Sequence, residues 1–282
     1  MKIAIIGLGG MGSWLAREML ATGHEIAAFD IRPHVEFPAG ARRLEQLREI
    51  RQYRPDMLIN AVTIHQTVPV FQKLSLFLPH DCMLVDITSI KDAPAAYYRG
   101  CKRPFASIHP MFGPVSASAR TLSGESMIII NESCPAGKHF FHTFGSARGL
   151  HCREMSFEEH DHMMAHSLTL PFATSLAFAA CMDGGEVPGT TFARHRELAR
   201  TLLREDDDLL VEILFNRYSL DQIDSVCGRL RFLRQVIAAG DHGEAEGFIA
   251  RLRENTGVTA RSASGSSLPR NPAYRRPGYP GG

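Results

Sequence analysis

Three glycines near the amino terminus have the spacing of a phosphate-binding loop. Residues 3–12 read Ile-Ala-Ile-Ile-Gly-Leu-Gly-Gly-Met-Gly, which places Gly-x-Gly-x-x-Gly between an apolar strand and the start of a helix. In such a loop Gly7 permits the tight turn, Gly9 lets the backbone approach a pyrophosphate, and Gly12 lets the helix pack closely on the strand. The unpaired N–H groups of the helix then face the phosphates. The motif in this context predicts a dinucleotide site; the alternative is a turn that binds nothing.

An acidic residue at the end of the second predicted strand indicates which dinucleotide binds. Asp30 lies eighteen positions past Gly12, where a carboxylate can accept hydrogen bonds from both ribose hydroxyls of NAD and repels a 2′-phosphate. Arg32 could instead turn toward that phosphate and permit NADP. We expect NAD, with NADP as the alternative. The predicted cofactor-binding residues are Gly7, Leu8, Gly9, Gly10, Met11, Gly12, Asp30, Arg32 and Thr63.

A histidine stands at the end of the fifth predicted strand, in the segment Ser-Ile-His-Pro-Met-Phe-Gly-Pro at 107–114. Ligands of open α/β sheets bind beyond the carboxyl ends of the strands, so His109 is expected to face the nicotinamide end of a dinucleotide. An imidazole has a pKa near neutrality, which suits it to take a proton from a carbinol as hydride departs. Position alone leaves a structural histidine as an equal alternative.

The elements that position these residues alternate between strands and helices up to about residue 157. The expected strands are 2–6, 24–30, 56–62, 82–88, 105–108, 126–130 and 150–156, and the expected helices are 11–22, 41–54, 67–78, 91–99 and 137–148. This order predicts βαβ units on a Rossmann-type, doubly wound parallel sheet. From about residue 158 to residue 254 the apolar residues recur at helical spacing instead. The predicted domains are therefore a dinucleotide-binding domain at 1–157, an all-helical substrate and dimerisation domain at 158–256, and a disordered tail at 257–282.

Charge and composition exclude several classes of protein. The chain has 31 basic and 30 acidic residues among 282, a net charge of +1, which favours no nucleic-acid partner. The tail from residue 257 holds four arginines and no acid, so the preceding residues carry a charge of −3. The six scattered cysteines lack zinc-site spacing, and the first residues lack a signal-peptide pattern, which favours a cytoplasmic location. The uncharged run 167–182 is expected to form a buried core helix, without a membrane span.

Several segments together resemble the prephenate dehydrogenase family. His-Pro-Met-Phe-Gly-Pro at 109–114 looks like its signature, and Val-Asp-Ile-Thr-Ser-Ile-Lys at 85–91 is similar to its Asp-x-x-Ser-Val-Lys segment. Glu-His-Asp-His-Met-Met-Ala at 159–165 resembles its Glu-His-Asp-x-x-Met-Ala helix start, and Arg200 has the spacing of its substrate-carboxylate arginine. The resemblance extends from the first strand to about Asn255.

The resemblance implies a homodimeric enzyme of tyrosine biosynthesis, with a Rossmann domain joined to a helical domain. The reaction would be NAD-dependent oxidation of a small cyclohexadienyl substrate, prephenate, with loss of carbon dioxide. His109 would assist removal of the hydroxyl proton, and Ser89 would hydrogen-bond the same hydroxyl or orient the imidazole. Arg200 would clamp a substrate carboxylate with its planar fork of donors, and Lys91 is assigned to substrate binding.

Each assignment has a structural alternative. Ser89 could cap the helix that follows it, Lys91 could be a first-turn surface lysine, and Arg200 could be a surface arginine paired with Glu197 or Glu205. No metal is expected. His160 and His162 are two positions apart and point to different sides of a helix. His162 and His166 could share one face, but that pair lacks a third ligand for a zinc ion.

One departure from the family pattern leaves the substrate open. Many members carry a histidine on the helix after Glu-His-Asp, whereas residues 167–172 here read Ser-Leu-Thr-Leu-Pro-Phe, with Thr169 and Phe172 at those positions. Loss of a polar donor relaxes or redirects specificity, so prephenate, arogenate and 4-amino-4-deoxyprephenate all remain candidates. The rival functions are a β-hydroxyacid-type dehydrogenase or reductase, which typically uses a lysine absent from 158–182, and a non-catalytic dinucleotide sensor.

Overall fold

The computed structural model describes residues 1–113, 122–185 and 187–258. The chain divides into two compact units, Met1–Val226 and Cys227–Gly282. Most of the predicted tail at 257–282 lies outside the described residues, as does Pro114, the last residue of the histidine motif.

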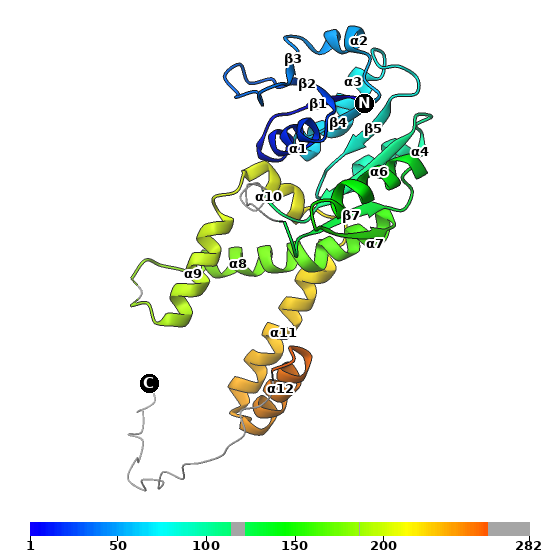
Figure 1. The fold of residues 1–282 in the computed structure, drawn as a ribbon. Coiled ribbons are helices and arrows are strands. Elements are labelled where there is room, and N and C mark those ends of the chain that lie inside the picture. Colours follow the sequence, from blue (N-terminus) through cyan, green and yellow to red (C-terminus); the bar gives the residue numbers. More distant parts are fainter. Residues whose placement is uncertain (114–121, 186, 259–282) are drawn as a thin grey trace, which may run out of the picture. The chain divides into compact units, whose positions relative to one another are not determined.

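An eight-stranded sheet forms the centre of the first unit (Figure 1). Its order is β3-β2-β1-β4-β5-β6-β7-β8, with the pair β6–β7 antiparallel and the other pairs parallel. The strands are β1 (Lys2–Ile6), β2 (Glu25–Phe29), β3 (Arg42–Arg43), β4 (Met57–Asn60), β5 (Met83–Asp86), β6 (Phe105–Pro110), β7 (Ser126–Ile130) and β8 (His151–Met155). The predicted Rossmann-like fold class is confirmed, although the last two strands, β7 and β8, run against the direction of the others.

The helices of the sheet region are α1 (Gly10–Ala21), α3 (Ile64–Leu74), α4 (Asp92–Arg99) and α6 (Pro135–Ser146). The residues of β4 and β5 are all buried, as a parallel sheet covered on both faces requires. On one face Trp14 of α1 packs edge-on against Phe112 and Phe144, with ring centroids 5.3 and 5.9 Å away. The apolar runs of the sequence therefore form the core that holds the strand ends in place.

The helix predicted at 41–54 is wrong. The segment contains the two-residue strand β3, a 3₁₀ turn η1 (Leu47–Glu49) and the four-residue helix α2 (Ile50–Tyr53). The N–H of Leu44 donates to the carbonyl of Ala28 at 2.8 Å, so the backbone continues the sheet edge at this point. This pairing across the chain outweighs the local helical pattern of apolar residues.

The helical region of the first unit begins with one long helix of three parts, α7 (Phe157–Met164), the π-helical turn η2 (Ala165–Thr169) and α8 (Leu170–Ala180). Then follow α9 (Thr190–Leu202), α10 (Asp207–Leu214) and the first residues of α11 (Ser219–Ala239). In the second unit the rest of α11 packs on α12 (His242–Asn255) through Phe232 and Phe248, whose ring centroids lie 5.2 Å apart.

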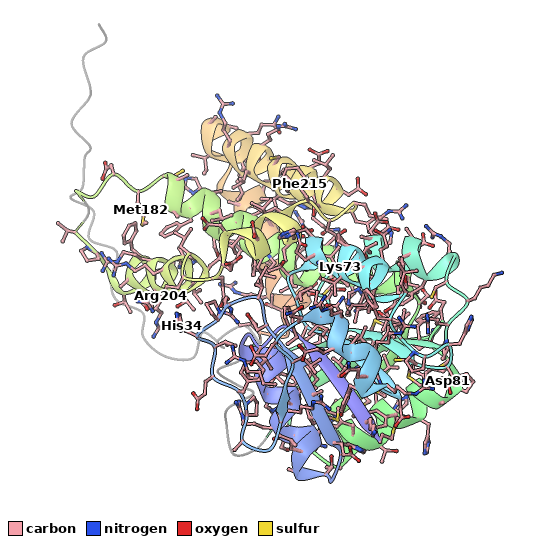
Figure 2. All side chains as sticks on the ribbon, turned by 90° about the horizontal axis from the view of Figure 1, so that it is seen from above. His34, Lys73, Asp81, Met182, Arg204 and Phe215 are labelled. Carbon is pink, nitrogen blue, oxygen red and sulfur yellow. The ribbon has the colours of Figure 1, made fainter. Side chains whose placement is uncertain are left out.

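The prediction of a buried core helix at 167–182 is wrong for the single chain, because no residue of α8 is buried. Among the described residues, Phe157–Ala180 is the helix that by length and composition is long and apolar enough to cross a membrane. The start of that helix is polar and includes the buried residues His160 and Asp161. Other apolar side chains nearby are also uncovered, such as Phe215, which is 83% exposed (Figure 2).

Candidate active site

The glycine loop has the geometry that a pyrophosphate requires. Gly7 has a φ of +91°, and a Cβ atom there would lie 2.6 Å from the carbonyl oxygen of Ala61. A Cβ atom on Gly12 would overlap the carbonyl oxygen of Gly7, whereas one on Gly9 would meet no atom within 4 Å. Space is therefore open at the position where the backbone would approach phosphates, at the start of α1. These residues fit a dinucleotide.

The Asp30 carboxylate is hydrogen-bonded to the backbone of this loop. Its Oδ2 accepts a hydrogen bond from the N–H of Leu8 at 2.7 Å, and both carboxylate oxygens accept from the Arg32 guanidinium at 2.9 Å. Burial opposes ionisation, but the bonds from Arg32 and the backbone outweigh it and lower the pKa of Asp30 to about 2. Asp30 is thus a fixed anion, and Arg32 must turn aside before a ribose can reach it.

Four of the predicted segments meet at one edge of the sheet, because the carboxyl ends of parallel strands point the same way. The glycine loop follows β1, Thr63 follows β4, Ser89 follows β5, and His109 lies in β6. Asp86 pairs in register with Ser107, which brings the end of β5 level with the histidine segment. Thr63 is exposed, Ser89 is half-buried and His109 is 6% exposed.

His109 is the first member of a line of three hydrogen-bonded groups. Its Nδ1 lies 3.0 Å from Nε2 of His160, and Nδ1 of His160 lies 2.8 Å from Oδ1 of Asp161. The same Oδ1 accepts from the backbone N–H of Lys91 at 2.8 Å. All these side chains are buried, and His160 is 0% exposed. Hydrogen bonds through the protein interior therefore connect the imidazole of His109 to the carboxylate of Asp161.

Hydrogen-bond donors and acceptors along this line determine the tautomers. An ionised Asp161 accepts from Nδ1–H of His160, which leaves Nε2 of His160 as an acceptor. His109 must then donate through its Nδ1–H, and its own Nε2 carries the free lone pair. The arrangement leaves Nε2 of His109 unprotonated at the carboxyl edge of the sheet.

Both imidazoles are held neutral. The pKa of His109 lies well below 6.5, first because of burial and then because of His160 and the ammonium of Lys91. Burial and Lys91 also lower the pKa of His160 to about 3. Asp161 shifts the other way, since burial raises its pKa to about 6 against the bond from the Lys91 backbone.

Lys91 is buried, whereas one of the two roles considered for it was that of a surface lysine. Its side chain is 0% exposed and its Nζ lies 2.5 Å from Oδ2 of Asp86 and 2.7 Å from the carbonyl oxygen of Ile108. The surface-lysine alternative is therefore wrong. The ammonium of Lys91 has two protein partners. It binds the carbonyl oxygen of Ile108, the residue before His109, and it balances the charge of the Asp86 carboxylate.

Among the described residues, neither Ser89 nor Arg200 forms a hydrogen bond or an ion pair with this cluster. The helix-cap alternative for Ser89 is wrong, because α4 begins after Lys91 and has no side-chain cap. Arg200 is exposed on α9, which packs against α8 (Figure 1), and it takes part in none of the ion pairs among the described residues. Thr169 is buried and donates to the carbonyl oxygen of Ile213 at 3.0 Å.

Sequence reasoning missed the roles of His160, Asp161 and Asp86 in this cluster. The signals were present in the two segments, Asp-x-x-Ser and Glu-His-Asp, that carry the family resemblance. Helical spacing showed only that His160 and His162 diverge. It could not show that His160 reaches across to a strand 51 residues earlier in the chain.

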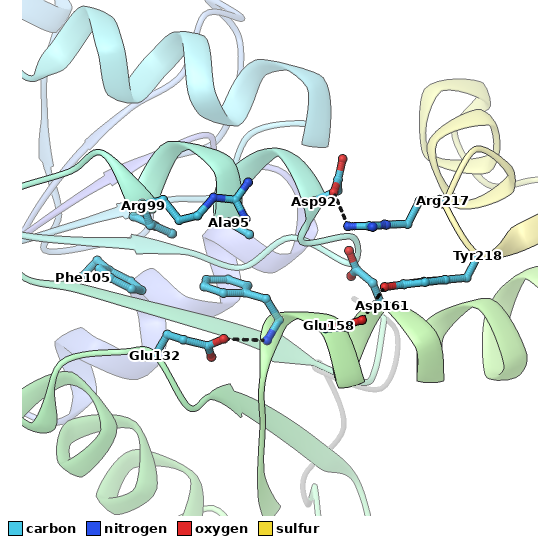
Figure 3. A pocket seen from close by; sticks show the side chains of 11 residues that line it. Asp92, Ala95, Arg99, Phe105, Glu132, Glu158, Asp161, Arg217 and Tyr218 are labelled. Carbon is cyan, nitrogen blue, oxygen red and sulfur yellow. Dashed lines mark hydrogen bonds and ion pairs between the residues drawn. The ribbon is translucent and has the colours of Figure 1, made fainter.

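A pocket of about 420 Å³ lies at the Asp161 end of the line (Figure 3). Charged side chains on its wall include Asp92, Glu132, Glu158 and Arg217. Arg217 pairs with Asp92 at 3.4 Å, and the two lie beside the Asp161 carboxylate in the view.

Comparison with known proteins gives matches over part of the chain. Residues 16–139 match the family model described as prephenate dehydrogenase, nucleotide-binding domain. The T-protein of Enterobacter agglomerans is 32% identical over 123 residues, which cover 43% of this chain and 32% of that protein. Arogenate dehydrogenase 2, chloroplastic, of Arabidopsis thaliana is 26% identical over 185 residues, 59% of this chain and 50% of that protein. The matches thus span half or less of the curated relatives' lengths.

The fold is shared over a longer stretch. The crystal structure of prephenate dehydrogenase from Aquifex aeolicus, in complex with hydroxyphenyl propionate and NAD⁺, superposes with a TM-score of 0.77 at 18% identity. The superposition covers 91% of this chain and 97% of that one. At such identity the likeness establishes the fold.

Proposed function

We propose that the chain is a member of the prephenate dehydrogenase family and an NAD-dependent cyclohexadienyl dehydrogenase of tyrosine biosynthesis, as the match of residues 16–139 to that family's nucleotide-binding domain supports. The observation that carries the proposal is the neutral, buried His109, whose free Nε2 lies at the same sheet edge as the dinucleotide loop. A hydride acceptor and a proton acceptor at one edge are what oxidation of a carbinol needs.

In the proposed reaction a bound nicotinamide supplies the hydride acceptor. His109 accepts the hydroxyl proton at Nε2, and the carbonyl that forms draws electrons from the bond to the departing carboxylate. Ser89 is assigned to the substrate hydroxyl, because Nδ1 of His109 already has His160 as its partner. Arg200, with no ion-pair partner among the described residues, remains the proposed carboxylate clamp.

The test is a substrate panel. Purified protein is incubated with NAD or NADP and with prephenate, arogenate or 4-amino-4-deoxyprephenate, and formation of the reduced cofactor is followed by absorbance. We expect turnover of at least one of the three, and the relative kcat/KM values identify the substrate. Failure to oxidise all three with either cofactor contradicts the proposal.

Cofactor preference is expected to depend on Asp30. Asp30→Asn keeps an acceptor for the N–H of Leu8 but removes the charge that repels a 2′-phosphate. Weaker bonds to the ribose should raise KM for NAD roughly tenfold, as expected for loss of a charged hydrogen bond, while KM for NADP falls. Arg32→Ala is the matched variant and should impair NADP alone. Unchanged preference in both variants contradicts the assignment.

The uncovered apolar surface of α8 supports a homodimer. None of its residues is buried in the single chain, and Leu198 and Phe215 are 64% and 83% exposed on neighbouring segments. A second copy of the chain would remove such a surface from water. Light scattering is expected to give twice the chain mass. A monomeric mass at micromolar concentration contradicts this part of the proposal.

We also propose a cytoplasmic location, in keeping with six free cysteines.

A further inference from the structure

A carboxylate stands at the far end of the hydrogen-bonded line that begins at the catalytic base. Asp161 is connected to His109 through His160, over hydrogen bonds of 2.8 and 3.0 Å. Each link has one donor and one acceptor that can exchange roles when a proton enters at Nε2 of His109. The line therefore has the geometry of a proton path as well as that of a support.

The surroundings of His109 make a lasting positive charge there costly. The imidazole is buried, and the ammonium of Lys91 lies against the carbonyl oxygen of the preceding residue, Ile108. An imidazolium at this position would add a second buried cation beside Lys91, whose own buried anion, Asp86, is already paired with it. Asp161 is the carboxylate that the line of bonds reaches.

We propose that His109, His160 and Asp161 act as one proton-accepting unit, in which uptake of the substrate's hydroxyl proton at His109 is matched by transfer of a proton from His160 to Asp161. This inference rests on the proposed dehydrogenase function. His160 and Asp161 act through His109 and are positioning residues.

The steps balance without any net proton. As hydride passes to the oxidant, a nicotinamide dinucleotide, the hydroxyl proton moves to Nε2 of His109. The Nδ1 proton of His109 then moves to Nε2 of His160, and the Nδ1 proton of His160 moves to Oδ1 of Asp161. Both imidazoles stay neutral. When carbon dioxide leaves, the electrons of the broken bond aromatise the ring and leave a phenolate, which takes the proton back by the reverse shift.

Burial favours Asp161 as the place where the proton rests, against the opposing charges of Lys91 and Arg217. Lys91 donates its backbone N–H to Asp161, while Asp92, Glu158 and Arg217 line the pocket with it (Figure 3). Burial raises the pKa of Asp161 to about 6, well above the value of about 3 for His160. A proton on the unit is therefore more stable on the carboxylate than on either ring.

Two variants separate proton transfer from mere orientation. In Asp161→Asn the amide oxygen can still accept from Lys91 N–H and from His160, so the tautomers survive but the anion is gone. In His160→Gln the amide oxygen can accept from Nδ1–H of His109, but the path is broken. We expect kcat to fall at least about tenfold in each, a part of the roughly 10²–10⁴-fold contribution of acid–base catalysis, with KM changed less than about threefold.

The matched control is Asp92→Asn, the same substitution in an exposed carboxylate of the same pocket. Its kcat should stay within about twofold of the wild type. The pH profile adds a readout that a structural role does not move. Wild-type kcat should fall as pH drops through about 6, where Asp161 becomes protonated, and this acidic limb should be absent from Asp161→Asn. Variants that retain wild-type kcat and the acidic limb overturn the proposal.

A titration that needs no turnover distinguishes failure of the proposed function from failure of the proton-accepting unit. If the wild type oxidises no substrate of the panel, nuclear magnetic resonance of ¹⁵N-histidine and ¹³C-aspartate in the full chain still tests the unit. Lowering the pH through about 6 should protonate the Asp161 carboxylate while His109 and His160 remain neutral with Nδ1–H tautomers. Formation of an imidazolium before the carboxylate titrates overturns the inference.

Discussion

Replacing Lys91 by methionine is expected to lower the free energy of unfolding of the first unit by about 3–5 kcal/mol, the usual cost of breaking a buried ion pair from one side. Methionine has a similar length but no charge. It would leave the Asp86 carboxylate 0% exposed without its cation, and the carbonyl oxygen of Ile108 without its donor. Asp86 would retain Thr88 as a donor, at 2.8 Å, which cannot neutralise a buried anion.

Urea unfolding followed by fluorescence measures this effect. Trp14 is the single tryptophan and is buried against the sheet, so its emission reports the unit that contains Lys91. A double variant, Asp86→Leu with Lys91→Met, should recover part of the lost stability, because no charge is then left unpaired. A loss below about 1 kcal/mol for Lys91→Met would show that the ammonium is dispensable for folding.

Replacing His109 by asparagine is expected to lower kcat by roughly a hundredfold or more, the scale of a lost general base. Asparagine can still bond to His160 but has no lone pair basic enough to take the hydroxyl proton. Substrate and cofactor contacts made by other residues remain, so KM should change little. The measurement is steady-state kinetics on whichever panel substrate the wild type oxidises.

His162→Asn is the matched control for this variant. His162 is exposed two residues past His160 and stacks on Tyr218, with ring centroids 3.7 Å apart, outside the proton-accepting line. Its kcat should remain within about twofold of the wild type. Equal turnover by His109→Asn and the wild type would remove His109 from the catalytic role.

Local patterns predicted the cofactor half of the molecule well. The glycine spacing and the apolar runs place the loop between β1 and α1, and β1 and β7 have the predicted bounds. These features follow from residues that are neighbours in the chain, since a tight turn needs glycine and a covered strand needs consecutive apolar side chains. The strand-end position of His109 followed from the same alternation of elements.

Contacts between distant segments determined the rest. The edge pairing of β3 replaced an expected helix, and the exposure of α8 reversed an expected burial. Within the single chain α9 covers α8 only in part, and periodicity cannot reveal how much of a helix its neighbours cover. Lys91 is buried because Asp86 and the Ile108 carbonyl meet it across two strands.

By itself, then, the sequence determined the dinucleotide loop, the alternating fold and the candidate base. Only the tertiary structure decided how that base is held, since His160 and Asp161 reach it over more than fifty residues of chain. The physical reason is that a tautomer is set by its hydrogen-bond partners, and those partners are chosen by packing in space.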